Sequence, residues 1–175
     1  MYFGCRYKIL SQGCTPHHTG NPALVLDVGA KFGYFSLMAA SMGCNVVAWE
    51  PIPKYAGFFK YALLRNQFLS KVQLRQRIVD DRGRGYRKSI ADLTGTDWVT
   101  SGLGGTPILH THLLHNATKI KAVSEKIDDV VRPQDVLVMK IDAQGLEPAV
   151  LKGSKALLLD GNVKVGFSIL CFESI

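Results

Sequence analysis

Four residues near the start of this chain have types and spacing that could form a ligand site. Asp27 and Glu50 each lie at the end of a short apolar segment, and Gly29 and Gly33 follow the first of these acids. A glycine can adopt a positive φ and clear space for a ligand. The free N–H groups at the start of a following helix can face a carboxylate, and Glu50 can accept both hydroxyls of a ribose. The pattern predicts a pocket for a nucleoside-bearing cofactor.

The form of the glycine turn favours S-adenosylmethionine over NAD. The turn reads Gly29-x-x-x-Gly33 and contains no Gly-x-Gly-x-x-Gly, whose glycines let the backbone approach a pyrophosphate. S-adenosylmethionine has no phosphate, so a looser turn suffices, and Asp27 can meet the ammonium of its methionine part. An NAD-dependent oxidoreductase is the enzyme alternative, weakened by the missing third glycine.

Strand and helix patterns alternate along the chain and place these acids at strand ends. Such alternation predicts an α/β fold with a doubly wound parallel sheet, whose ligands bind at the carboxyl edges of the strands. We expect the acids that follow the strands to share that edge: Asp27, Glu50, Asp80 or Asp81, Asp142 and Glu173. The predicted strands are 24–28, 46–49, 72–79, 136–141 and 163–172, with an edge strand at 119–123.

Helices are predicted between the strands from apolar residues at helical spacing. One runs from Phe32 to Gly43, and another starts at Pro53. The apolar face of the second should comprise Tyr55, Phe58, Phe59, Ala62 and Leu63. A short helix should follow Glu147-Pro148, and Ser154 is expected to cap the next one, which ends at Leu159.

Length and composition are those of one globular domain. The 175 residues are 47% apolar and 20% charged, and no apolar run is long enough to span a bilayer. We expect residues 1–23 to form an arm or loop and residues 24–175 to form the domain, with an irregular insert at 82–122. A loop of that length is usually functional or disordered.

Cysteines and charge exclude some classes of site. The cysteines at 5, 14, 44 and 171 are scattered, which predicts reduced thiols, a cytoplasmic location and no metal site. The net charge of +7 comes largely from residues 65–88. Because aromatic residues are not interleaved with these cations, a solvated basic face is favoured and nucleic-acid binding is not expected.

The motifs resemble those of the FkbM-type methyltransferases, a branch of the Rossmann-like S-adenosylmethionine-dependent enzymes. The matching segments are Leu26-Asp-Val-Gly-Ala-Lys-Phe-Gly-Tyr-Phe-Ser, Trp49-Glu-Pro and Met139-Lys-Ile-Asp-Ala-Gln-Gly-Leu-Glu-Pro-Ala-Val-Leu-Lys-Gly-Ser. The resemblance implies methyl transfer to a hydroxyl oxygen of a sugar, glycolipid or other small molecule.

The resemblance also implies roles for individual residues. Asp27, Gly29, Ala30 and Gly33 would line the methionine part of the cofactor, and Glu50 would hold the ribose. Asp80 or Asp81 would lie near the adenine. Asp142 would stand between cofactor and acceptor, where it is the candidate base that removes the hydroxyl proton. The alternative for Asp142 is a purely structural contact with the cofactor ammonium or the following turn.

Three features depart from the family pattern. Lys31 replaces a small polar residue, and its cation is expected to pair with Asp27 or to lie over the pocket mouth. Gln144 replaces a glutamate beside Asp142. The resemblance also implies a further helix and an antiparallel hairpin after the fifth core strand, and we expect residues 24–175 to be a C-terminally incomplete domain without them. These departures leave open a second hypothesis, a catalytically degenerate cofactor-binding remnant.

Overall fold

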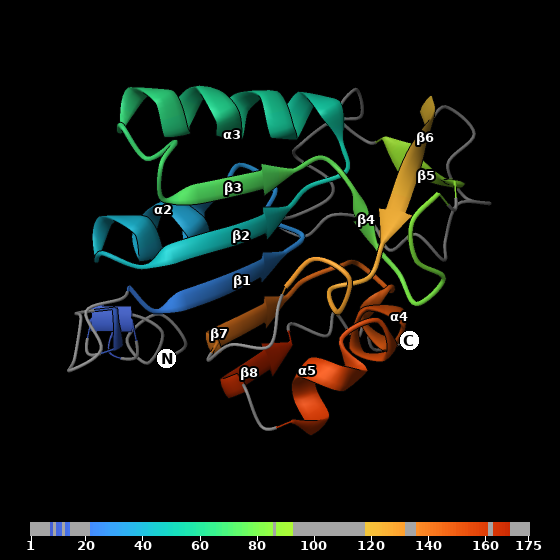
Figure 1. Cartoon of the computed structure of the whole chain (residues 1–175). Helices are drawn as coiled ribbons and strands as arrows, with labels where there is room; N and C mark the ends of the chain where they lie inside the picture. Colours follow the sequence, from blue (N-terminus) through green and yellow to red (C-terminus); the bar gives the residue numbers. More distant parts are fainter. Residues whose placement is uncertain are drawn as a thin grey trace, which may run out of the picture.

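A computed structural model describes residues 8, 10, 11, 13, 14, 22–85, 87–92, 118–131, 136–160 and 163–168 of the chain. Its strands and helices alternate over most of the sequence (Figure 1). In chain order they are β1 (Leu24–Val28), α2 (Tyr34–Ser41), β2 (Asn45–Trp49), α3 (Pro53–Arg65), β3 (Val72–Arg75), β4 (Ile78–Val79), β5 (Arg87–Asp92), β6 (Thr118–Glu125), β7 (Val136–Ile141), α4 (Glu147–Lys152), α5 (Lys155–Leu159) and β8 (Val163–Ser168).

The central sheet is parallel, as the sequence predicts. Its five strands lie in the order β3-β2-β1-β7-β8, and every neighbouring pair is parallel (Figure 1). All five residues of β1 are buried, which suits a central strand covered on both faces. In register, Asp27 lies opposite Lys140 of β7. The predicted doubly wound α/β fold is confirmed.

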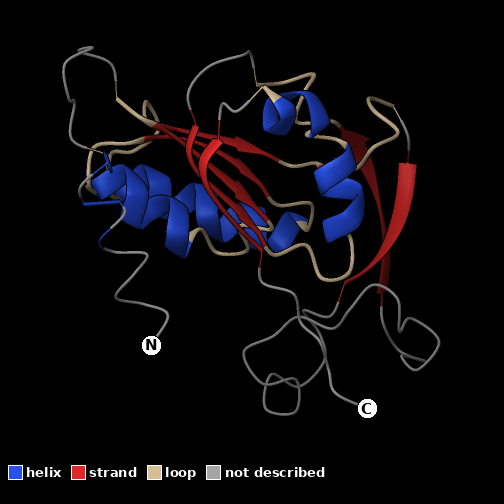
Figure 2. Ribbon diagram, turned by 90° about the horizontal axis from the view of Figure 1, so that it is seen from below, coloured by secondary structure: helices blue, strands red, loops and turns tan. Residues whose placement is uncertain are grey.

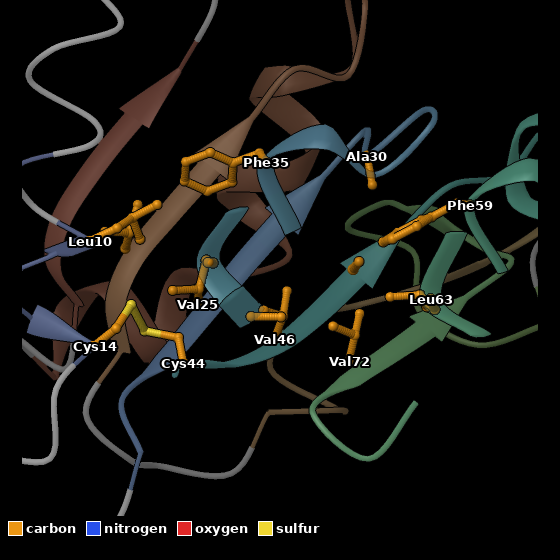
Figure 3. Packing of buried hydrophobic residues seen from close by; sticks show 14 residues of the cluster. Leu10, Cys14, Val25, Ala30, Phe35, Cys44, Val46, Phe59, Leu63 and Val72 are labelled. Carbon is orange, nitrogen blue, oxygen red and sulfur yellow. A yellow bond between two sulfur atoms is a disulfide. The ribbon is translucent and has the colours of Figure 1, made fainter. Parts of the chain in front are cut away.

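Helices cover both faces of this sheet, and each face has its own apolar core (Figure 2). On one face, Phe35 and Ala39 of α2 and Phe59 and Leu63 of α3 pack on the strands (Figure 3). On the other face, residues of the turn after β6 and of α4 and α5 pack around Trp49. The two layers hold the carboxyl ends of β1, β2 and β7 at one edge.

A second sheet of three strands, in the order β4-β6-β5, adjoins that edge. The prediction of one strand over 72–79 is wrong in this respect: the segment forms β3 and β4, which belong to different sheets. The strand predicted over 119–123 is present as the longer β6, but the prediction that it is an edge strand is wrong: β6 is the middle strand, parallel to β4 and antiparallel to β5. Strand β5 lies in the segment 82–122, which was predicted to be irregular. Residues 86 and 93–117 of this segment lie outside the described residues.

Two described residues of the N-terminal segment are fixed to the domain. Leu10 is fully buried in the core under α2, and Cys14 forms a disulfide with Cys44 (Figure 3). The prediction of reduced thiols is therefore wrong for this pair, because 30 residues of separation hid two side chains that the fold brings together. Disulfides are typical of oxidising compartments.

Two helix details also differ from prediction. Phe58 was placed on the apolar face of α3, but it is 55% exposed, and the buried residues of this helix are Ala56, Phe59 and Leu63. Ser154 precedes α5 without capping it; its hydroxyl donates to the carbonyl oxygen of Val150 at 2.9 Å. Pro53 begins α3 as predicted.

None of the helices in the described part of the chain is long and apolar enough to cross a membrane. Within the same residues, no group of three or more His, Cys, Asp or Glu side chains is placed to hold a metal ion.

Candidate functional site

The glycine turn after β1 is held against the ends of two neighbouring strands. The backbone N–H groups of Gly29 and Ala30 donate to the Trp49 carbonyl oxygen at 3.0 and 2.9 Å. Gly29 has φ +74°, and a Cβ on it would lie 1.8 Å from the carbonyl oxygen of Asp142. Glycine is therefore needed here for two reasons: its φ is positive, and the backbone of Asp142 lies too close for a Cβ. This approach brings Asp142 to the turn, as the shared sheet edge predicts.

Gly33 has a packing role in addition to the role that the resemblance implies for it. Its φ is +82°, and a Cβ there would meet the ring of Phe59 at 2.0 Å. The residue therefore lets the start of α2 pack against α3. Ala30, between the two glycines, is buried in the same core.

Asp27 is fully buried, and both of its carboxylate oxygens have partners. Oδ1 accepts from the Lys140 ammonium at 2.8 Å, and Oδ2 accepts from the Ser36 hydroxyl at 2.7 Å. The same ammonium donates to the Gly29 carbonyl oxygen at 3.0 Å. A buried carboxylate needs such a partner. The pair therefore fixes the turn to β7 as well as to β2.

Lys140 is the site residue that sequence reasoning missed. The signal was present, since Lys140 is the one charged residue in the apolar strand 136–141, and a buried charge implies a partner. Lys31 was instead considered as a partner for Asp27. In the structure the Lys31 ammonium lies 5.8 and 5.7 Å from the ring centroids of Phe32 and Tyr55.

Glu50 directly follows β2, beside the glycine turn, and only 4% of its surface is exposed. Its carboxylate accepts the backbone N–H of Lys31 at 2.7 Å and that of Ile52 at 2.9 Å. Burial raises the pKa of Glu50 to about 7, although these two hydrogen bonds lower it. Burial therefore destabilises the ionised carboxylate, while the two backbone N–H groups fix its position. Such perturbed groups are concentrated at functional sites.

The turn after β7 carries Asp142 and Gln144. The Gln144 amide donates from Nε2 to Asp142 Oδ1 at 2.7 Å, and Glu147 accepts the backbone N–H groups of Ala143 and Gly145 at 2.9 and 2.8 Å. Glu147 thus supports the turn. Gln144 Oε1 is buried and has no hydrogen-bond partner among the residues that the structure describes. Reversing the amide would set Oε1 against the Asp142 carboxylate, so the orientation is fixed by charge.

Asp80 follows β4 of the second sheet, whereas the sequence predicted a strand of the parallel sheet before it. The Asp80 carboxylate accepts from the Arg82 guanidinium at two oxygens, 3.0 Å each, and from its backbone N–H at 3.1 Å. The side-chain hydrogen bonds from Arg82 lower the pKa of Asp80 to about 2. Glu173, the last acid expected at the edge, lies outside the described residues.

The fold and this edge define a class: a Rossmann-like α/β domain with a glycine turn and acids at the ends of β1, β2 and β7. The sequence-family model of the methyltransferase FkbM domain matches residues 27–171 of this chain. The chain belongs to this family of S-adenosylmethionine-dependent methyltransferases. The match decides against the NAD-dependent alternative.

Other comparisons are weaker. No curated protein matches the chain. Similar solved structures include the SAM-dependent methyltransferase from Agrobacterium tumefaciens, at 19% identity over 41% of this chain and 23% of that one, with a TM-score of 0.35. They also include precorrin-6y C5,15-methyltransferase from Geobacter metallireducens GS-15, at 23% identity, 42% and 37% coverage and a TM-score of 0.32. The chain spans less than two thirds of these proteins, and TM-scores this low add nothing to the family match.

Proposed function

We propose that this chain binds S-adenosylmethionine at the edge formed by β1, β2 and β7 and methylates a hydroxyl oxygen of a small molecule, sugar or glycolipid. The observation that carries the proposal is Glu50. Its carboxyl group is buried at a cost and fixed by two backbone N–H groups beside the glycine turn. A carboxylate can accept hydrogen bonds from both hydroxyls of the cofactor's ribose. These hydrogen bonds would offset the cost of burying the charged group.

The other residues fit the methionine part of the cofactor. Gln144 Oε1 is a buried acceptor without a partner among the described residues, and an ammonium can donate to it. Asp27 is proposed to attract the same ammonium, with its charge shared with Lys140. Gly29, Ala30 and Gly33 would form the backbone of this part of the pocket. Because Arg82 occupies both oxygens of Asp80, Asp81 is the better of the two candidates for contact with the adenine.

Bound S-adenosylmethionine supplies a methyl group as an electrophile on a sulfonium. The chain has to orient the acceptor hydroxyl and remove its proton, and orientation alone can lower a barrier by several kcal/mol. We assign proton removal to Asp142, which lies at the turn and is oriented by the Gln144 amide. A positioned carboxylate of this kind typically contributes about a hundredfold or more to the rate.

The test is transfer of labelled methyl from S-adenosylmethionine to pooled hydroxylated acceptors, comparing the wild type with Asp142→Asn. Asp160→Asn, at the exposed end of α5, is the matched control. We expect a base-stable methyl ether as product and at least about a hundredfold loss of rate for Asp142→Asn only. A base-labile methyl ester would contradict a hydroxyl acceptor. Cofactor binding without transfer to any acceptor would instead support a degenerate remnant.

A further inference from the structure

The outer face of α3 carries an exposed stripe of cationic and aromatic residues. Lys54, Phe58, Tyr61 and Arg65 follow one another at intervals of four, three and four residues, which puts them on one side of a helix. Phe58 is 55% exposed, Tyr61 63% and the neighbouring Leu64 59%. The buried residues of α3 lie on its opposite side. Among the described residues, the apolar core clusters do not include Phe58, Tyr61 or Leu64, and more than half of each of these side chains is exposed.

The charge around this stripe has one sign. The segment 51–79 contains no aspartate or glutamate, and its cationic residues are Lys54, Lys60, Arg65, Lys71, Arg75 and Arg77. Arg75 is used inside the molecule, where it pairs with Glu125. Lys54, Lys60 and Arg65 are exposed on α3 together with the aromatic residues. A second copy of this chain would therefore place cations against cations.

The stripe adjoins the candidate site. Phe32 of the glycine turn has its ring centroid 4.8 Å from that of Tyr55 and 6.0 Å from that of Phe58, both in edge-on contact. Helix α3 begins three residues after Glu50. A partner that covers the stripe would thus lie next to the proposed cofactor pocket.

We propose that the outer face of α3 docks the protein on the surface of an anionic lipid bilayer. Exposed aromatic and leucine side chains enter the boundary between headgroups and acyl chains, while lysine and arginine on the same helix remain among anionic headgroups. The absence of acids from the whole segment matches a negatively charged surface. This proposal stands apart from methyl transfer and does not require it.

The experiment is cosedimentation of the full chain with phosphatidylcholine vesicles, with and without phosphatidylserine. We expect binding only with phosphatidylserine. Lys54→Gln with Arg65→Gln should weaken it by about 25-fold, since each cation near an anionic surface contributes about fivefold. Phe58→Ser with Tyr61→Ser should weaken it by at least about tenfold. The matched control is Leu158→Ser with Leu159→Ser on α5, two exposed leucines beside Asp160, and it should bind like the wild type.

Three results would overturn the proposal. The first is equal sedimentation with both kinds of vesicle, and the second is unchanged binding by the α3 variants. The third is a concentration-dependent dimer in gel filtration that the Phe58→Ser, Tyr61→Ser variant abolishes, because α3 would then be a protein interface. Thermal unfolding of each variant establishes that it is folded. If the aromatic variant is unfolded, the Lys54→Gln, Arg65→Gln variant, which changes only exposed residues, still decides the test.

Discussion

Replacing Glu50 by glutamine should stabilise the protein in neutral and alkaline solution while removing the proposed ribose contact. The carboxyl group has a pKa of about 7 in the folded state, against its ordinary value of 4.5. Because the folded state binds the proton more tightly, the stability that the protonated group provides at acid pH is lost as the pH rises from about 4.5 to about 7. Glutamine is neutral like the protonated form and does not lose this stability with pH. Its Nε2 cannot accept the second backbone N–H, so part of the gain is offset by about 1 kcal/mol at every pH.

The magnitude follows from the same values. A difference of about 2.5 pKa units corresponds to about 3 kcal/mol at 1.36 kcal/mol per unit. Urea unfolding should therefore show the stability of Glu50→Gln relative to the wild type to be about 3 kcal/mol higher at pH 8 than at pH 5, with Glu50→Gln the more stable protein at pH 8. Both measurements are made without ligand.

Glu125 provides a control of opposite sign. Burial alone would raise the pKa of Glu125, but hydrogen bonds from Arg75 and Trp49 outweigh it and hold the pKa below its usual value. Glu125→Gln should thus destabilise the protein at pH 8 and have less effect as the carboxyl is protonated in acid. A Glu50→Gln protein that is less stable than the wild type at pH 8 would refute the reasoning, because the carboxylate would then be a stabilising group.

Three further perturbations test the frame around the site. Lys140→Met should cost about 3–5 kcal/mol in urea unfolding by leaving Asp27 buried and unpaired, and addition of Asp27→Asn should recover part of this; strictly additive losses would contradict the pairing. Gly29→Ala should cost at least about 2 kcal/mol and abolish binding of S-adenosylhomocysteine, because its Cβ has no room, whereas Gly57→Ala, with nothing within 4 Å, should raise the melting temperature slightly. Cys14→Ser should cost about 3–4 kcal/mol by opening a loop of 30 residues, and an equal effect of reducing agent on wild type and variant would contradict the disulfide.

The sequence was informative where local pattern and tertiary structure agree. The strands that contain Asp27 and Lys140 are apolar runs, and the glycine after the first marks the turn, so β1, β7 and their shared edge could be predicted. Glu50 was placed by the same reasoning. The family motif covered these same segments, which are the ones that form the central sheet.

Long-range contacts could not be predicted from pattern alone. The Cys14–Cys44 disulfide joins residues whose spacing resembles no cysteine motif. The division of 72–79 into β3 and β4 depends on a turn at residues 76 and 77 that leaves each strand in a different sheet. Phe58 sits at an apolar position of the helical pattern, yet it lies beyond the edge of the buried face. In each case the observed structure depends on whether a residue meets a partner that is distant in the sequence, which the local pattern does not encode.

The central claim, that Glu50 binds the ribose hydroxyls of the cofactor, is tested most directly by calorimetric titration with S-adenosylhomocysteine at pH 6 and pH 8. Ionisation of a group with a pKa of about 7 is needed for two hydroxyl hydrogen bonds, so wild-type affinity should be about tenfold higher at pH 8. Glu50→Gln should bind much more weakly and without this pH dependence. Equal affinity of the two proteins, or no binding by folded wild type, would contradict the account.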